Sequence, residues 1–254
     1  MGKFKKTSKT NMRLNKKPNK FKRIRLILIF LVLSVQVYSQ SAQEYYKKGI
    51  ENYKKENFKE AIELFTKAIN HNLSLADAYH KRGHAYYKTG DNINAIKDYT
   101  KAIELDPNNS ETYYFRAFSY SSSEPLQALS DYSKAIEINP KENFYFFGRG
   151  GIKSGLSDYR GAIIDYSKAI EIKPDDWFAF SNRADCKKEI NDFTGAIIDY
   201  SKAIDINPND WMAFRERGLI KIELNEIDSG CLDLSKAGEL GYSQAYDLIK
   251  KYCN

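Results

Sequence analysis

The 254-residue chain has few residues of the kinds that break regular structure or carry out covalent chemistry. With 6 prolines and 14 glycines it cannot be a collagen-like or proline-rich fibre. Its 3 cysteines are far apart, and no spacing suggests a nucleophile with its base. The sequence also lacks a phosphate-binding loop, a dinucleotide fingerprint and a serine-nucleophile elbow. These absences predict a protein that is not an enzyme and that uses no cofactor.

Acidic residues are missing from the first 39 positions, which carry 11 Lys and Arg residues. The rest of the chain has 29 Lys and Arg residues against 33 Asp and Glu residues, so its net charge is −4 rather than the +7 of the whole. A nucleic-acid-binding protein needs a basic face on its folded part. The charge distribution therefore predicts that no nucleic acid is a partner.

The basic segment leads into an apolar run at residues 26–37. This run is shorter than the stretch of about 20 apolar residues that crosses a bilayer comfortably, and it is typical of a secretory signal peptide. Val37 and Ser39 are small enough for the signal peptidase pockets, which places cleavage before Gln40. We therefore expect residues 1–39 to be a basic leader and signal peptide.

Because this leader resembles bacterial ones, the expected location is the periplasm or cell envelope of a Gram-negative bacterium. The alternative is an uncleaved anchor that attaches the protein to a membrane through residues 24–37. Translation could begin at Met1 or at Met12, and the later start would give a leader of more ordinary length.

The remaining sequence repeats itself about every 34 residues. Residues 98–107 recur with small changes at 131–140, 165–174 and 199–208. A fixed period of this length indicates a solenoid. Within each period, apolar and small residues recur at three- to four-residue intervals in two stretches, separated by a turn such as residues 89–92. Each period is therefore expected to form two antiparallel helices.

The pattern resembles the tetratricopeptide repeat (TPR) family. Its small residue at position 8 is matched by Gly49, Gly83, Ala117, Gly150, Ala184 and Gly218. Its alanine at position 27 is matched by Ala68, Ala102, Ala135, Ala169, Ala203 and Ala237, and its proline at position 32 by Pro107, Pro140, Pro174 and Pro208. The six units span residues 42–75, 76–109, 110–142, 143–176, 177–210 and 211–244. The resemblance implies an all-α, right-handed solenoid, and residues 245–254 are predicted to cap it as a short helix.

Five units carry a charged pair on their facing helices. Position 7 is occupied by Arg82, Arg116, Arg149, Arg183 and Arg217, and position 23 by Asp98, Asp131, Asp165, Asp199 and Asp233. Pairing within a unit satisfies every Asp, whereas pairing with the following unit would leave Asp233 alone. Because a guanidinium can bind a carboxylate through two hydrogen bonds, we expect structural ion pairs.

In the family, positions 2, 5, 9 and 12 of the first helix usually line a concave face. The residues predicted from these positions to bind a partner are Tyr46, Tyr53, His80, His84, Tyr87, Tyr114, Phe118, Phe144, Phe147 and Phe178. Aromatic side chains supply contact area at low entropic cost and dominate binding hot spots. The resulting hypothesis is a non-catalytic scaffold or adaptor of the bacterial cell envelope that holds a peptide or partner protein. A glycan-binding module that stacks sugars on Tyr and Phe is an alternative, and some of these rings could instead pack between helices.

Histidine and cysteine leave two further questions open. His80 and His84 have the spacing of two metal ligands on one helix face, with Asp77 nearby, but the glutamate of a zinc protease is absent. A metal-dependent role there is kept only as an alternative, and no resident metal is predicted. Cys231 and Cys253 could form a disulfide where the last helix folds back, and Cys186 is expected to lie in the core.

Overall fold

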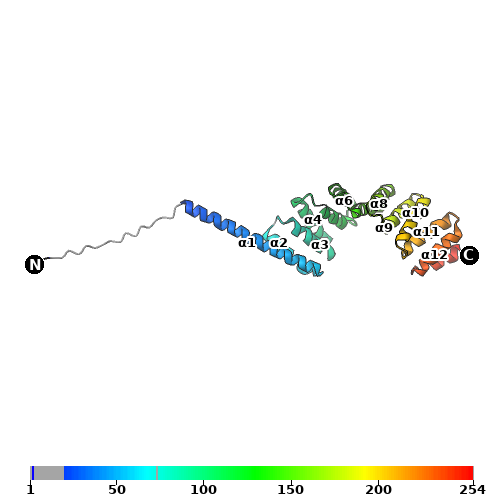
Figure 1. Cartoon of the computed structure of the whole chain (residues 1–254), viewed down its shortest axis with the longest axis horizontal. Coiled ribbons are helices and arrows are strands. Elements are labelled where there is room, and N and C mark those ends of the chain that lie inside the picture. Colours follow the sequence, from blue (N-terminus) through cyan, green and yellow to red (C-terminus); the bar gives the residue numbers. More distant parts are fainter. Residues whose placement is uncertain (1, 3–19, 73, 254) are drawn as a thin grey trace.

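The computed structural model describes residues 2, 20–72 and 74–253, and within them it contains thirteen α-helices and no β-strand. Figure 1 shows these helices as one continuous row, with α1 at one end and α12 near the other. The helices are α1 (Lys20–Lys54), α2 (Phe58–His71), α3 (Ala76–Lys88), α4 (Asn92–Leu105), α5 (Ser110–Tyr120), α6 (Pro125–Ile138), α7 (Asn143–Gly155), α8 (Tyr159–Ile172), α9 (Trp177–Glu189), α10 (Phe193–Ile206), α11 (Trp211–Glu223), α12 (Ile227–Glu239) and α13 (Ala245–Tyr252). The predicted all-α solenoid is confirmed.

Each odd-numbered helix from α1 to α11 packs against the helix that follows it, and each pair packs against the next pair. In five of the six hairpins, one residue of the tight turn adopts the left-handed conformation, for example Gly90 at φ 82° and Asn191 at φ 61°. Asp side chains cap the N-termini of the helices that follow: Asp91 accepts a hydrogen bond from the backbone N–H of Asn94, and Asp192 accepts one from that of Gly195. Turn and cap together fix where each second helix begins.

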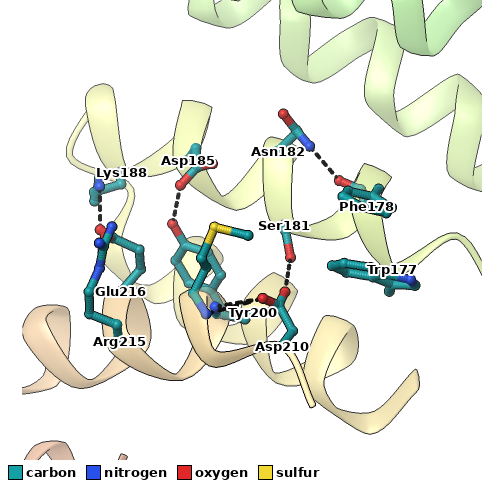
Figure 2. A pocket seen from close by; sticks show the side chains of 12 residues that line it. Trp177, Phe178, Ser181, Asn182, Asp185, Lys188, Tyr200, Asp210, Arg215 and Glu216 are labelled. Atoms are coloured by element: carbon teal, nitrogen blue, oxygen red, sulfur yellow. Dashed lines mark hydrogen bonds and ion pairs between the residues drawn. The ribbon is translucent and has the colours of Figure 1, made fainter. Parts of the chain in front are cut away.

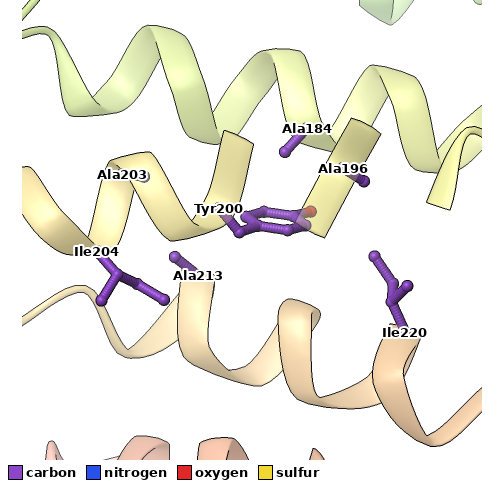
Figure 3. Close-up of a cluster of buried hydrophobic side chains, with 7 residues drawn as sticks. All are labelled: Ala184, Ala196, Tyr200, Ala203, Ile204, Ala213 and Ile220. Carbon is purple, nitrogen blue, oxygen red and sulfur yellow. The ribbon is translucent and has the colours of Figure 1, made fainter. Parts of the chain in front are cut away.

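The core is a row of buried side chains, one large residue per unit at position 24. Those residues are Phe65, Tyr99, Tyr132, Tyr166, Tyr200 and Leu234, and all are almost fully buried. The rings fit because the facing first helix carries glycine or alanine. A Cβ atom on Gly83 would lie only 3.0 Å from the ring of Tyr99. Figure 3 shows the arrangement around Tyr200, which packs among Ala184, Ala196, Ala203, Ile204, Ala213 and Ile220.

A second repeated feature, here called the arginine staple, links each unit to the one before it. In unit five, Arg183 donates from Nε and Nη2 to the two carboxylate oxygens of Asp199 at 2.8 and 2.7 Å. Its Nη1 donates to Ser167 Oγ of the preceding unit at 2.9 Å, and its guanidinium lies over the ring of Phe180. All five Arg side chains make the bidentate bond to the Asp of their own unit and reach back to a Ser or Thr at position 25 of the unit before: Thr66, Thr100, Ser133, Ser167 and Ser201.

In the C-terminal half of the row, the staple contains a second basic side chain. Lys153, Lys187 and Lys221 each add a second cation to the Asp of units four, five and six, at 2.7–2.8 Å. Units two and three have Tyr86 and Tyr120 at the corresponding position. Asp98 and Asp131 therefore have an arginine as their cationic partner, without a lysine.

Helix α1 spans the expected boundary between the leader and the first unit. It continues without a break from Lys20 to Lys54, through the predicted cleavage site before Gln40. The seven Lys and Arg residues that precede Lys20 lie outside the described residues. Within the described ranges, no helix combines the length and the apolar character needed to cross a bilayer.

A disulfide closes the C-terminal end. Cys231 of α12 is bonded to Cys253, which directly follows α13, and the two Cα atoms are 5.9 Å apart. Ala245 at the start of α13 is fully buried, so this helix covers the last pair. Cys186 is a buried free thiol.

Candidate functional site

Three pockets adjoin one another along the first helices of units three to six. The α5/α7 pocket has a volume of about 570 Å³, the α7/α9 pocket about 480 Å³ and the α9/α11 pocket about 310 Å³. Phe144 lines the first two pockets, and Phe178 and Asn182 line the last two. The three pockets thus form one track, called the groove below.

The lining of the α5/α7 pocket includes four aromatic rings, those of Tyr114, Phe115, Phe144 and Tyr145, and two carboxylates, those of Glu111 and Glu142. Tyr114 lies with its ring centroid 4.9 Å from that of Phe144 and 5.4 Å from that of Tyr145, and the last two are 4.7 Å apart. The Tyr145 hydroxyl donates to Ser110 Oγ at 3.0 Å. Burial raises the pKa of Tyr145, and the negative charges of Glu142 and Glu111 raise it further. The pocket is therefore aromatic and electrically negative.

The α7/α9 pocket is almost wholly apolar. Its walls are Phe144, Phe147 and Phe178, and the side chains of Phe144 and Phe178 are 37% and 49% exposed. The polar groups at its edge are already engaged: Asn143 Nδ2 donates to Asp176 Oδ2 at 3.0 Å, and Asn182 Nδ2 donates to the backbone carbonyl of Phe178 at 2.8 Å. This pocket suits a large apolar side chain.

The α9/α11 pocket is lined by charged side chains, and three of them, Lys188, Arg215 and Glu216, are paired with one another (Figure 2). Lys188 Nζ donates to Glu216 at 2.6 Å, and Arg215 pairs with the same carboxylate. Although burial opposes the shift, these two cations lower the pKa of Glu216. The Tyr200 hydroxyl donates a hydrogen bond to Asp185 Oδ1, and burial raises the pKa of Asp185.

Nine of the ten predicted partner-binding residues keep accessible surface: Tyr46, Tyr53, His84, Tyr87, Tyr114, Phe118, Phe144, Phe147 and Phe178. Their rings form a nearly continuous series of contacts along the first helices, in which Tyr53 meets His84, Tyr87 meets Phe118, and Tyr114 meets Phe144. Of these nine, only Tyr114, Phe144, Phe147 and Phe178 line the three pockets of the groove.

The prediction that His80 contacts a partner is wrong. Its side chain is 3% exposed and lies between the rings of Tyr99 and Phe115. Nδ1 is 2.8 Å from Thr112 Oγ1, and burial lowers the pKa of His80 to about 3. A residue at this position faces the next first helix, and the small Thr112 leaves it room to enter the core.

The two histidines do not form a metal centre with a third ligand. Their ring centroids are 6.5 Å apart, and His84 stacks on Phe115 at 4.1 Å. In the part of the chain that the structure describes, no three His, Cys, Asp or Glu side chains are grouped so that they could hold a metal ion. Nothing in this region favours the metal-dependent alternative.

Sequence reasoning missed several residues that line the groove. Glu142, Tyr145 and Trp177 come from the starts of first helices, and Asn182 and Glu216 from position 6. These positions lie outside the family positions considered above. A signal was nevertheless present, since residues at the first turn of a helix lie beside the neighbouring first helix when pairs stack.

Three family models match the chain. The model described as "Tetratricopeptide repeat" matches residues 76–109, one described as "TPR repeat" matches residues 49–90, and a second "Tetratricopeptide repeat" model matches residues 179–210. No curated protein matches the chain.

Solved structures share the fold at low sequence identity. YrrB, described as a TPR protein with an unusual peptide-binding site, is 22% identical with a TM-score of 0.65, and the match covers 73% of this chain and 97% of YrrB. PilF of Pseudomonas aeruginosa is 15% identical with a TM-score of 0.70, covering 84% and 98%. A tetratricopeptide repeat protein from Parabacteroides merdae is 22% identical with a TM-score of 0.57, covering 84% of both chains.

Proposed function

Because this chain is a tetratricopeptide repeat protein, we propose that it is a non-catalytic scaffold that holds an extended segment of a partner protein in the groove. Repeats of this family typically serve protein–protein interaction, and YrrB, which shares the fold, is described as having an unusual peptide-binding site. Fold likeness does not assign a ligand, so the proposal depends on the groove of this chain.

The observation that carries the proposal is the continuity of the groove. Exposed phenyl rings at Phe144 and Phe178 join three pockets whose lining changes along the groove. The first pocket is acidic and aromatic, the second is apolar, and the third has charged side chains of both signs. Exposed aromatic side chains grouped on one surface mark interaction sites in soluble proteins. A track of pockets separated by shared walls fits successive side chains of an extended peptide better than one compact ligand.

The proposed location is the cell envelope, after export through the leader at residues 1–39. Its support is the basic N-terminal segment, the apolar run and the disulfide between Cys231 and Cys253, because disulfides persist in oxidising compartments. An N-terminus at Gln40 in protein isolated from its host is the expected result. Recovery of an intact leader in the membrane fraction would instead support attachment through residues 24–37.

The direct test is selection of a phage-displayed random dodecapeptide library on the purified protein. Individual peptides are then synthesised and their Kd values measured. The double variant Phe144→Ala, Phe178→Ala is expected to weaken the selected peptides at least 30-fold, because truncating aromatic anchors costs about 2 kcal/mol or more.

The matched control is Ile164→Ala, Ile198→Ala on the second helices α8 and α10. These side chains are 64% and 57% exposed, so the same loss of exposed apolar surface occurs away from the groove. Equal binding by the wild type and the groove variant would contradict the proposal. If the wild type binds an oligosaccharide array and the groove variant does not, the result would support the glycan-binding alternative instead of peptide binding.

A further inference from the structure

The α5/α7 and α7/α9 pockets share the ring of Phe144 but differ in charge. We infer that the groove is selective for a basic side chain, lysine or arginine, in the α5/α7 pocket and for a large apolar side chain two residues away in the α7/α9 pocket. This inference rests on the proposed function and names the chemistry of its partner.

The two carboxylates of the α5/α7 pocket have no cationic partner among the described residues. Glu111 is 53% exposed, and the nearest basic group is His80 Nε2 at 3.9 Å. Burial keeps that imidazole neutral by lowering its pKa to about 3. Glu142 accepts only a long hydrogen bond from Asn139 Nδ2, at 3.4 Å. Both negative charges therefore remain available to a ligand.

Several other glutamates of the row are paired with basic residues. Glu216 in the α9/α11 pocket pairs with Lys188 and Arg215. On the second helices, Glu104 pairs with Lys101, and Glu137 pairs with Lys134. The carboxylates at the α5/α7 pocket differ from these paired ones, and no Lys or Arg lines that pocket.

Three of the four rings of this pocket add a second attraction for a cation. Tyr114, Phe144 and Tyr145 lie within 5.4 Å of one another around a volume of about 570 Å³. An ammonium or guanidinium group over an aromatic face is attracted by the ring quadrupole. The apolar stem of lysine or arginine can pack on the rings while its charged end reaches Glu111 or Glu142.

Geometry sets the spacing of the two ligand side chains. In an extended peptide, residues i and i+2 point to the same side and lie about 7 Å apart. Adjacent pockets on either side of one phenyl ring therefore take side chains at i and i+2. The neighbouring Phe147 and Phe178 make the second position apolar. An acidic peptide would meet uncompensated negative charge at the first position.

The peptides selected from the dodecapeptide library test the inference. They are expected to be enriched in a basic residue followed two positions later, or preceded two positions earlier, by a large apolar residue. For one selected peptide, replacing arginine by neutral citrulline should weaken binding to the wild type about tenfold. The same replacement should leave binding to the double variant Glu111→Gln, Glu142→Gln unchanged.

The matched control is Glu104→Gln, Glu137→Gln, which removes the same two charges from exposed, ion-paired positions on α4 and α6. It is expected to retain the tenfold preference for arginine. Raising the salt concentration should weaken the arginine peptide and not the citrulline peptide.

Failure of this inference and failure of the proposed function give different results. Peptides that require Phe144 and Phe178 but show no preference for a basic residue, or prefer an acidic one, would overturn the inference and leave the scaffold intact. Peptide binding that is indifferent to Phe144 and Phe178 would overturn both.

Discussion

The side chains buried between the helices are nearly the same in every unit, whereas those lining the groove differ from one unit to the next. Arg183, Asp199 and Tyr200 have counterparts in the same roles in the neighbouring units. In contrast, the two glutamates of the α5/α7 pocket have no cationic partner among the described residues, whereas Glu216 of the α9/α11 pocket is paired with Lys188 and Arg215. Repetition therefore maintains the stacking of the pairs, and departure from repetition creates a surface that can distinguish ligands.

The largest effect is expected where the staple is broken and the groove is left intact. Asp199→Ala removes a carboxylate that is almost fully buried and leaves Arg183 and Lys187 without their common partner. Loss of one member of a buried ion pair costs about 4 kcal/mol of unfolding free energy. The measurement is urea unfolding, monitored by the fluorescence of Trp177 and Trp211, which begin the two helices next to α10, the helix of Asp199.

The control for Asp199→Ala is Asp205→Ala on the same helix. Asp205 forms an exposed pair with Lys202 at 3.7 Å, and exposed pairs contribute little. Similar destabilisation by both variants would show that the staple has no special role.

The second effect concerns the C-terminal end of the row. Cys253→Ser opens the disulfide that joins α12 to the end of α13. A closed loop of this size stabilises a protein by about 3 kcal/mol. Hydrogen exchange should become faster in α13 and α12 and remain unchanged in α3 and α4. Uniformly faster exchange along the whole chain would contradict the idea that the disulfide acts locally.

The third effect depends on pH. Burial lowers the pKa of His80 to about 3 in the folded protein, from its ordinary value of 6.5. As the pH falls below 6.5, His80 of the unfolded chain takes up a proton, whereas His80 of the folded protein stays neutral until about pH 3. The contribution of neutral His80 to the free energy of unfolding is therefore fully present above pH 6.5 and is lost as the pH falls towards 3. His80→Gln should reduce the slope of stability against pH in this window by about 1.4 kcal/mol per pH unit. Identical slopes for variant and wild type would contradict the burial of a neutral imidazole.

The smallest effect tests the link between units. Ser167→Ala removes the hydroxyl that accepts from Arg183 Nη1 and keeps the bidentate bond to Asp199. We expect a loss of about 1 kcal/mol, typical of one hydrogen bond. Peptide affinity should not change, because Ser167 lies on a second helix, away from the groove. A change in affinity without a change in stability would contradict the separation between staple and groove.

The helix pairs and the within-unit partner of each Arg follow from counting residues, because a regular repeat fixes which positions face each other. The Ser and Thr acceptors of the staple were overlooked, although all five stand at position 25. The error at His80 has another cause: whether a position-5 side chain turns outwards or inwards depends on the size of its neighbour on the next helix, here Thr112. Position numbering carries no such information.

The groove was harder to foresee than the fold. Which rings are exposed could be predicted from the family positions, and Phe118, Phe144 and Phe178 are indeed exposed. Which charged side chains of the groove are ion-paired could not be predicted, because pairing depends on whether side chains of different helices come within about 4 Å of each other. Lys188 reaches Glu216 across 28 residues, and Glu111 finds no equivalent cation within the described ranges.

The uneven number of cations on the five aspartates has a mechanical consequence. Units four to six hold their carboxylate between an arginine and a lysine, and the last unit is also tied by a covalent bond, whereas units two and three rely on one arginine each. In a stack where each unit contacts only its neighbours, resistance to force is set locally. Unit one has Lys48 and Leu64 at the two positions and therefore lacks the pair. Pulled from its two ends, the protein should yield first in units one to three and keep its C-terminal half folded to higher tension.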